Sequence, residues 1–460
     1  MKNHERTVMR MQPMHIRTQT FEEVNLGYSK EEAMQEASRC LDCKHQPCVN
    51  GCPVGIDIPG FIKMVEQDRI DEAYRIIEAS SCLPAVCGRV CPQETQCEAV
   101  CVRAIKGEPV AIGHLERYVA DQYYMKHHDV ESIKQKSIKV AVIGSGPAGL
   151  SFAHDVIKAG FQVDLYEALH TPGGVLSYGI PAFRLPKDVV KREVDTLIEQ
   201  GVHLLTDVII GKTLMLEDLH AMGYHAIFIG TGAGLPKFMN ISGEMLNGVY
   251  SANEFLTRIN LMKAYDSTSE TPIKRGKRVA VIGGGNVALD AARAARRLGA
   301  DIVYLVYRRG MQEIPARHEE VEHALEEGII FKLLTQVKEI IGDENGTVKA
   351  ISCCEMILGE PDASGRRRPI ENPKKIMVFN VDEVIMAIGT TPNPMIIQDH
   401  QTLQATSHGC LVVNQETNET TIPMIFAGGD VVTGSATVIL AMEAGRKAAK
   451  VVIERLQGLT

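Results

Sequence analysis

Two glycine-rich segments of the chain have the residue spacing that binds a dinucleotide pyrophosphate. Their small residues are Gly144, Gly146 and Gly149 in the first segment and Gly283, Gly285 and Ala288 in the second. Each segment follows an apolar stretch, at 139–143 and at 278–282, and precedes a sequence typical of a helix. Glycine permits a tight turn in which backbone N–H groups at a helix N-terminus approach the phosphates closely. The segments therefore predict two dinucleotide sites, with Asn286 among the contacts of the second.

The residues at the end of the next strand distinguish the two sites. The first site has Glu167 there, whereas the second has Arg308 and Arg309. An acid at this position accepts hydrogen bonds from a free ribose 2′-OH, and arginine neutralises a 2′-phosphate. We therefore expect FAD at the first site and NADPH at the second, as in a flavin-dependent pyridine-nucleotide oxidoreductase. The alternative for a single segment is a strand–helix turn that binds no ligand.

Nine of the twelve cysteines lie between residues 40 and 101, in two runs. The runs consist of Cys40, Cys43, Cys48 and Cys52, and of Cys82, Cys87, Cys91, Cys97 and Cys101. In ferredoxins, closely spaced thiolates hold one [4Fe–4S] cluster and the cysteine before a proline ligates the other. Because Cys52 and Cys91 both precede prolines, the runs predict iron–sulfur clusters. Thiolates also suit zinc, so a pair of structural zinc sites is the alternative.

The sequence around these cysteines is typical of helices. Ser29 and Glu32 have the spacing of a capping box, and 57–79 has the apolar periodicity of a helix pair. The segment is short for an independent core, so metal binding is expected to contribute to its folding free energy. We therefore expect a small α-helical domain that is stabilised by its clusters.

From residue 137 onward the pattern changes to alternating strands and helices. Gly174 lies in a loop that is compatible with covering a flavin, and Gly232 and Gly429 lie in turns that follow apolar strands. Asp430 is expected to accept a hydrogen bond from a ribityl hydroxyl. A last amphipathic helix begins near Thr437, where its dipole would favour a reduced flavin anion. For any one of these turns, the alternative is a simple connection between elements.

The order of these elements predicts the fold class. It is α/β, with two nested Rossmann-type dinucleotide-binding domains preceded by an α-helical iron–sulfur domain. The expected domains are 1–136 for the iron–sulfur part, 137–268 for the first part of the FAD-binding domain, 269–385 for an inserted NADPH-binding domain, and 386–460 for the second part of the FAD-binding domain.

The composition is that of a globular enzyme. A net charge of −8 argues against a nucleic-acid partner. The sequence has no stretch of about 18 apolar residues, as a membrane span requires. Its N-terminal residues also have no apolar segment of the secretory type. We therefore expect a cytoplasmic protein without a membrane partner.

The motifs together resemble the NADPH-dependent glutamate synthase small-subunit (beta) family, which shares its layout with the N-terminal half of dihydropyrimidine dehydrogenase. The similar segments are CLDCKHQPCVNGCP, LPAVCGRVCPQETQCEAVC, AVIGSGPAGL, VIGGGNVALD, YRRGMQEIPARHEE and FAGGD. The run GEPVAIGHLERYVAD resembles the stand-alone, homotetrameric branch most closely, which would allow a homo-oligomer. That branch also includes the large subunit of NADH-dependent reduced ferredoxin:NADP⁺ oxidoreductase.

The resemblance implies how two [4Fe–4S] clusters would be ligated. One cluster would take Cys40, Cys43, Cys48 and Cys101, and the other would take Cys52, Cys91, Cys97 and Glu116. Under this scheme Cys82 and Cys87 are not ligands. Spacing alone leaves all-thiolate schemes open, because nine cysteines are available for eight positions.

The resemblance also implies hydride transfer from NADPH to FAD, then one-electron steps through the clusters to a glutamate synthase large chain. Hydride transfer requires no general acid or base, so no catalytic side chain is expected. An alternative partner is a ferredoxin-linked flavoprotein in an electron-bifurcating complex. Two further alternatives are a disulfide reductase, for which only Cys353 and Cys354 are available as a pair, and a zinc-containing scaffold without activity.

Overall fold

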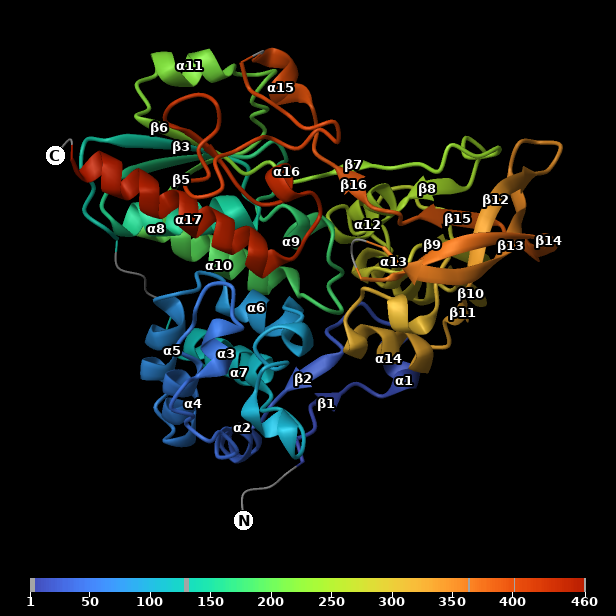
Figure 1. Ribbon diagram of the computed structural model, residues 1–460, viewed down its shortest axis with the longest axis horizontal. Coiled ribbons are helices and arrows are strands. Elements are labelled where there is room, and N and C mark those ends of the chain that lie inside the picture. The colour runs from blue at the N-terminus through green and yellow to red at the C-terminus, as the bar shows by residue number, and fades with distance from the viewer. Residues whose placement is uncertain (1–4, 128–131, 363–364, 401, 459–460) are drawn as a thin grey trace.

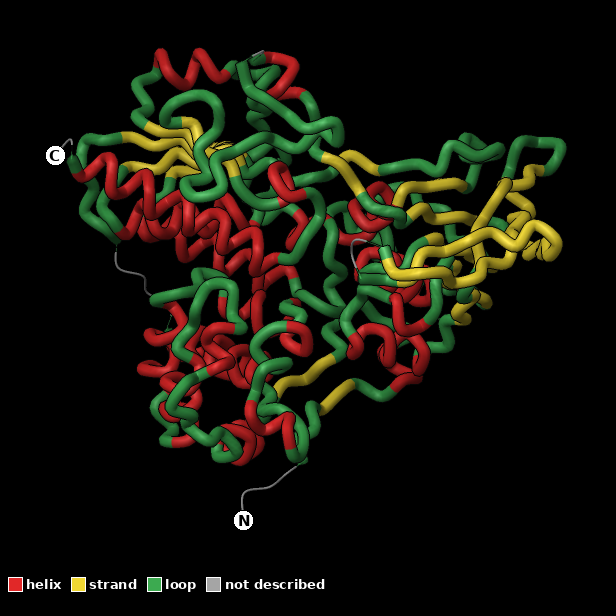
Figure 2. The backbone as a smooth tube through the Cα atoms, in the orientation of Figure 1, coloured by secondary structure: helices red, strands yellow, loops and turns green. Residues whose placement is uncertain are grey.

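The chain forms a helical head and two units built around parallel sheets (Figure 1). The computed structural model describes residues 5–127, 132–362, 365–400 and 402–458. Figure 2 shows that the strands are concentrated in the two units, whereas the head consists almost entirely of helices and loops.

The head is made of short helices with local caps. Its elements are α1 (Met14–Arg17), α2 (Lys30–Ala37), α3 (Pro47–Asn50), α4 (Ile58–Glu66), α5 (Ile70–Glu78), α6 (Pro84–Val90), α7 (Ile112–Lys126), the 3-10 turns η1 (Gln93–Thr95) and η2 (Val102–Ile105), and the strand pair β1 (Arg10–Met11) and β2 (Asn25–Gly27). The predicted capping box is present, since the Ser29 backbone N–H donates to the Glu32 carboxylate at 2.6 Å and the Glu32 N–H donates to Ser29 Oγ at 3.3 Å. Phe61 of α4 and Leu115 of α7 are fully buried in one core. The helical character expected for the head is confirmed.

The first unit is a five-stranded parallel sheet in the order β17-β6-β3-β4-β5. Its strands are β3 (Lys139–Ile143), β4 (Gln162–Tyr166), β5 (His203–Leu205), β6 (Ala226–Ile229) and β17 (Ile425–Ala427). Its helices are α8 (Pro147–Lys158), α9 (Val175–Tyr178), α10 (Lys187–Gln200), α11 (Leu216–Ala221), α15 (Met395–Asp399), α16 (Asp430–Thr433) and α17 (Val438–Gln457). Both faces of the sheet are covered, as parallel sheets require. Val140 packs with the core beneath α8, α10 and α17, while Ala141 packs on the opposite face with α11 (Figure 1).

The second unit has a parallel sheet in the order β11-β10-β9-β15-β8, flanked by an antiparallel sheet in the order β12-β13-β14. The parallel strands are β8 (Val249–Ser251), β9 (Arg278–Ile282), β10 (Ile302–Val306), β11 (Ile330–Lys332) and β15 (Glu383–Met386). The antiparallel strands are β12 (Thr335–Gly342), β13 (Val348–Pro361) and β14 (Arg367–Asn380). The helices are α12 (Ala252–Asn260), α13 (Asn286–Arg297) and α14 (His318–Glu326), with the 3-10 turn η3 (Met311–Glu313). Val281 of β9 packs with α13, and Ile282 packs with the antiparallel sheet.

The second unit is inserted into the first. The chain leaves the first sheet after β6 and returns to it only at β17, which pairs with β6 in parallel. The two crossings lie side by side, because β7 (Leu235–Pro236) and β16 (Thr390–Thr391) form an antiparallel pair. The predicted nesting is therefore confirmed. Strand β8 and helix α12 fall within the range 137–268, which was expected to belong to the first unit, but β8 pairs with β15 in the second sheet.

No helix within the described part of the chain is both long enough and apolar enough to cross a membrane.

Candidate functional site

The first glycine-rich turn joins β3 to α8, and its three glycines have three different surroundings. Gly144 has a φ of +97°, and a β-carbon there would lie 2.6 Å from the Gly230 carbonyl oxygen. A β-carbon at Gly149 would lie 1.9 Å from the Gly144 carbonyl oxygen, so this glycine permits the close approach of α8 to β3. Gly146 has nothing within 4 Å of the equivalent position. The open side at Gly146, at the N-terminus of α8, is where a phosphate would fit.

Substitutions at these glycines should separate binding from folding. Gly146→Ala should leave the fold intact, since space is free and φ is −72°. It should weaken FAD binding about tenfold or more, because the methyl group occupies the space next to the backbone N–H groups. Gly149→Ala should instead destabilise the protein by about 1–3 kcal/mol through overpacking. Measurements of flavin content and of urea unfolding for both variants test this prediction. It would be contradicted if the two variants lost the same amount of flavin and had the same free energy of unfolding.

Glu167 lies at the end of β4, beside this turn. Its carboxylate accepts hydrogen bonds from the Ser145 N–H at 3.0 Å, from the Ser145 hydroxyl, and from the Leu169 N–H at 2.9 Å. Gly174 crosses the turn closely, since a β-carbon there would lie 2.9 Å from Gly146 Cα. The structure therefore brings Glu167 and Gly174 together with the glycine-rich turn.

The C-terminal part of the first unit closes around the same turn. Gly429 has a φ of +76°, and a β-carbon there would lie 2.9 Å from Ala148 Cβ at the start of α8. Asp430 accepts a hydrogen bond from the Ala436 N–H at 3.2 Å, and burial raises the pKa of its carboxyl to about 6. Thr437 caps α17, with its hydroxyl accepting from the Leu440 N–H at 3.4 Å. Gly232 follows β6 and has open space around it.

Lys187, which sequence reasoning missed, anchors the loop between Gly174 and α10. Its buried ammonium group donates to the carbonyl oxygens of Leu176, at 2.8 Å, and Ile180. Burial lowers the pKa of Lys187 to about 7. The signal was absent from the sequence because lysine at a helix start is ordinarily exposed.

Replacing Lys187 by methionine should remove a pH dependence of stability. In the unfolded chain the lysine pKa is near 10.4, so between about pH 7 and 10 the unfolded state binds a proton that the folded state does not. The free energy of unfolding of the wild-type protein should therefore rise with pH across this window, by roughly 3 kcal/mol relative to Lys187→Met. Urea unfolding of both proteins at pH 7 and 9.5 measures the difference. Parallel pH profiles would show that the folded chain keeps the ammonium charged.

The second glycine-rich turn joins β9 to α13, and its small residues have the same kinds of surroundings as those of the first turn. Gly283 has a φ of +145°, and a β-carbon there would lie 2.3 Å from the Ala387 carbonyl oxygen. Gly285 is open, with nothing within 4 Å of the place that a β-carbon would take, and Ala288 is fully buried beneath the turn. Asn286 is the first residue of α13, and its Oδ1 accepts a hydrogen bond from the Arg317 N–H at 3.1 Å.

The two arginines after β10 have different surroundings. Arg309 is buried, donates from Nε to the Arg367 carbonyl oxygen at 2.9 Å, and forms an ion pair with Asp362. Arg308 is exposed and makes no hydrogen bond or ion pair with any residue that the structure describes. Of the two, Arg308 is therefore the one that can offer its guanidinium group to a ligand beside the second turn.

The first predicted ligand set is brought together in the head. One cavity is lined by the four residues Cys40, Cys43, Cys48 and Cys101, with apolar walls that include Ile58 and Ile62. Cys101 comes from a different segment than the other three, so this crossing is a product of the fold. Leu41 and Val102, which also line the cavity, are 44% and 37% exposed.

The second predicted set also lies close together. Burial raises the pKa of the Cys97 thiol, and the charges of Glu98, Cys52, Glu116 and Cys91 raise it further. Glu116 is 6% exposed, and burial alone raises its pKa to about 8. Its Oε1 has no hydrogen-bond partner among the described residues. A buried carboxyl oxygen without a partner beside three thiols fits a metal ligand.

Of the remaining cysteines, Cys87 adjoins the second set, because its thiol is hydrogen-bonded to Cys91. Cys82 and Cys87 pack in the core of the first unit, and Cys87 Sγ lies 3.5 Å from Met442 Sδ of α17. Cys353 and Cys354 are buried on β13 of the second unit. In the described ranges, no group of three or more Cys, His, Asp or Glu side chains is arranged to hold a single metal ion. A cluster of four irons spans more space than a zinc ion, which lies about 2.3 Å from each thiolate.

Family comparisons agree with this arrangement. Residues 138–445 match the pyridine nucleotide-disulphide oxidoreductase family, and residues 17–128 match the family described as dihydropyrimidine dehydrogenase domain II, 4Fe-4S cluster. The first family covers more than half of the chain. The protein is therefore a pyridine nucleotide-linked oxidoreductase with an iron–sulfur head, which confirms the expected fold class.

Whole-chain relatives define the family more closely. The chain is 35% identical over 453 residues to the glutamate synthase [NADPH] small chain of Escherichia coli (strain K12), covering 97% of this chain and 96% of that protein. It belongs to the glutamate synthase small-chain family. It is also 35% identical over 440 residues to the NADP(+)-dependent formate dehydrogenase subunit beta of Moorella thermoacetica, covering 90% of this chain and 60% of that subunit.

Solved structures share the fold of the two units. Mycobacterium tuberculosis FprA in complex with NADPH has a TM-score of 0.59 at 20% identity, covering 70% of this chain and 85% of that one. T. acidophilum thioredoxin reductase has a TM-score of 0.51 at 20% identity, covering 69% of this chain and 98% of that one. These structures match the architecture of the nested sheets.

Proposed function

We propose that this chain transfers electrons from NADPH through FAD and two [4Fe–4S] clusters to a partner protein that forms glutamate. The observation that carries the proposal is Glu116, a buried carboxyl group without a hydrogen-bond partner for Oε1 in the described structure, beside Cys52 and Cys97. Such a buried oxygen is costly when it has no partner, and a cluster iron beside these thiols would supply one.

The contact between the head and the first unit supports a direct electron path. Helix α6 ends at Val90, directly before Cys91, and its N-terminus is held by the first unit, because Glu193 of α10 accepts a hydrogen bond from the Ala85 N–H at 2.7 Å. Cys87, one turn before Cys91, touches Met442 of α17. The set that contains Cys91 is therefore the natural first acceptor from the flavin.

The other set is the natural exit. Its cavity has exposed Leu41 and Val102 in its lining, whereas Cys91 and Cys97 are buried. Electrons would therefore pass from FAD to the cluster at Cys91 and then to the cluster at Cys101. A partner would accept them at the face that bears Leu41 and Val102.

In this scheme the protein binds and orients, and no side chain transfers a proton. Gly283, Gly285 and Ala288 would seat the pyrophosphate of NADPH, and Arg308 would bind its 2′-phosphate. Gly146, Glu167 and the start of α17 would hold FAD. When bound, the flavin accepts a hydride and releases electrons singly.

A second candidate partner is a ferredoxin-linked or other redox subunit. The relatives include an NADP(+)-dependent formate dehydrogenase subunit beta and an NADPH-Fe(3+) oxidoreductase subunit beta from Geobacter sulfurreducens. The same electron path would serve either partner, because the exit face is separate from the nucleotide site.

An anaerobic NADPH titration of the purified protein tests the proposal. Optical spectra should show loss of the flavin band, and low-temperature EPR should show reduced [4Fe–4S] signals at the same NADPH equivalents. Flavin bleaching without any cluster signal would contradict the proposal and leave a simple diaphorase or a disulfide reductase.

A further inference from the structure

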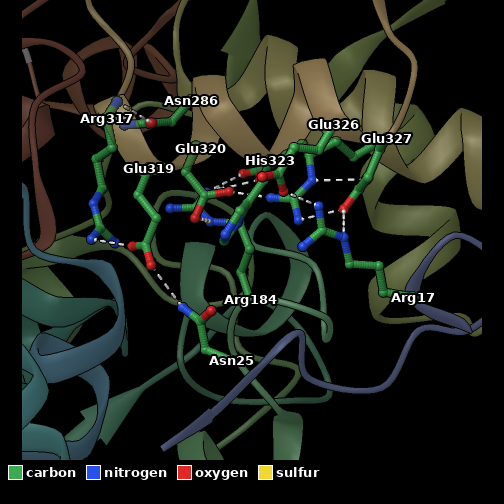
Figure 3. Close-up of polar contacts among 12 residues, drawn as sticks. Arg17, Asn25, Arg184, Asn286, Arg317, Glu319, Glu320, His323, Glu326 and Glu327 are labelled. Atoms are coloured by element: carbon green, nitrogen blue, oxygen red, sulfur yellow. Dashed lines mark hydrogen bonds and ion pairs between the residues drawn. The ribbon is translucent and has the colours of Figure 1, made fainter. Parts of the chain in front are cut away.

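Arg317 connects the second glycine-rich turn to the head. It precedes α14, and its backbone N–H donates to Asn286 Oδ1 at 3.1 Å, at the start of α13 (Figure 3). Its side chain runs away from Asn286 and ends against the head. There Nη1 donates to the Arg89 carbonyl oxygen at 2.7 Å, and Nη2 donates to Gln93 Oε1 at 3.3 Å. One residue thus contacts both the expected pyrophosphate turn and the cysteine-bearing segment.

The acceptors in the head flank Cys91 on both sides. Arg89 precedes Cys91 by two residues and Gln93 follows it by two. Gln93 is 5% exposed and donates from Nε2 to the Cys87 carbonyl oxygen at 3.2 Å. The contact extends to the next residues, because the His318 N–H donates to Glu94 Oε1 at 3.0 Å. A movement of Arg317 would therefore change the backbone around Cys91.

Buried charges hold Arg317 in this position. Arg317 is 6% exposed, and its Nη2 donates to Glu319 at 2.8 Å, while Asn25 Nδ2 donates to the other oxygen of Glu319 at 3.0 Å (Figure 3). Burial acts to raise the pKa of Glu319, but the nearby charges, Arg317 first, hold it well below its usual range. A displaced Arg317 would leave the half-buried Glu319 carboxylate without its ion-pair partner, which is costly. These contacts fix the Arg317 guanidinium group between the head and Glu319.

We propose that Arg317 is a positioning residue that couples nucleotide occupancy at α13 to the cluster held at Cys91. The coupling rests on the proposed function, since it requires NADP(H) at Gly285 and a cluster at Cys91. A pyrophosphate at the N-terminus of α13 changes the hydrogen bonding of its first turn, where Asn286 holds Arg317. Cluster properties respond to nearby hydrogen bonds and burial. Coupling between two equilibria is reciprocal. If bound nucleotide changes the equilibrium between oxidised and reduced cluster by a given factor, reduction of the cluster changes the nucleotide affinity by that same factor.

The test uses the flavin- and cluster-loaded protein with a redox-inert tetrahydro analogue of NADPH. Low-temperature EPR of the dithionite-reduced protein is recorded with and without the analogue, and the Kd of the analogue is measured for oxidised and reduced protein. In the wild type the EPR lines of one cluster should shift, and the Kd should change about fivefold or more between redox states.

Two variants interrupt the connection from opposite ends. Arg317→Met keeps the backbone contact with Asn286 but removes the side-chain contacts with the head, which are those with the Arg89 carbonyl oxygen, Gln93 and Glu94. Gln93→Met changes only the head. Both should retain iron and bind the analogue. Arg317→Met should lose the EPR shift and the redox dependence of Kd, whereas Gln93→Met, which keeps the contact of Arg317 Nη1 with the Arg89 carbonyl oxygen, should lose part of each. The matched control is Arg296→Met, because Arg296 lies on α13, the helix that begins at Asn286, but its side chain donates to the Ala300 carbonyl oxygen at 2.6 Å. It should behave like the wild type.

The outcomes separate this inference from the proposed function. The coupling alone would be overturned if the wild-type EPR signals of the clusters are normal but do not change when the analogue binds. It would also be overturned if the variants keep the full shift. A wild-type protein without any cluster signal would overturn the proposed function and the coupling with it. If Arg317→Met loses its cluster, Gln93→Met decides the result.

Discussion

Replacing Cys101 by alanine is expected to halve the iron and acid-labile sulfide of the protein, whereas replacing Cys82 should leave both unchanged. Cys101 lines one cavity with Cys40, Cys43 and Cys48, and its thiolate would complete the ligands of one cluster. Cys82 is buried in the core of the first unit and does not line that cavity, so its loss removes no ligand of that cluster.

The two variants are matched, since each removes one cysteine of the head and they differ only in the position of that cysteine. Iron and sulfide assays on anaerobically purified protein give the cluster content, and EPR shows which signal is lost. Loss of iron from Cys82→Ala would support one of the all-thiolate schemes that the spacing of nine cysteines permits. Full iron content in Cys101→Ala would remove the crossing arrangement altogether.

The parts of the fold that sequence reasoning predicted are those with local signals. Each glycine-rich turn is encoded within about a dozen residues by an apolar strand, small residues and a helix start. The nesting followed from the order of such segments, and β17 does return to pair with β6. The capping box at Ser29 was likewise readable, because its partners are three residues apart.

The ligand sets depended on information that is not local. The closure of the first set by Cys101 was available only from resemblance, because spacing allowed several combinations. The lack of a hydrogen-bond partner for Glu116 Oε1 among the described residues is visible only once α7 is packed in the fold, since a glutamate in the sequence is ordinarily a solvated charge. The sheet membership of β8 was missed for a related reason. Its three residues carry too short a pattern to assign it to one sheet or the other.

The charged junction between the three parts of the molecule was not predictable. Arg184, from the loop before α10, pairs with Asp290 of the second unit at 2.8 Å. It also pairs with Glu320 at 2.9 Å (Figure 3). Arg293 of α13 is fully buried and pairs with Glu327 at 2.9 Å. Charged residues at helical spacing normally indicate an exposed face. Here the head, the first unit and the second unit cover that face together, which no single segment reveals.

Replacing Arg308 by alanine is expected to lower the preference for NADPH over NADH about tenfold or more. Arg308 follows β10, beside the second glycine-rich turn. Its side chain is exposed, and its guanidinium group forms no hydrogen bond or ion pair with any described residue. A charge-assisted contact with the 2′-phosphate contributes about 1.5–3 kcal/mol, and about 1.4 kcal/mol corresponds to a factor of ten. The sequence alone assigned this task to Arg308 and Arg309 equally.

Arg309→Ala is the matched control, because Arg309 is the next residue in the chain and its guanidinium group binds other residues of the protein. Arg309 holds the ends of β13 and β14 through Asp362 and the Arg367 carbonyl oxygen. Its loss should reduce stability, since it removes the hydrogen bond to the Arg367 carbonyl oxygen and the ion pair with Asp362, but change nucleotide preference little. The ratio of kcat/KM for NADPH to that for NADH, measured with an artificial acceptor, separates the two arginines. A loss of preference in Arg309→Ala as large as in Arg308→Ala would mean that Arg309 leaves Asp362 when nucleotide binds, and that both arginines reach the phosphate.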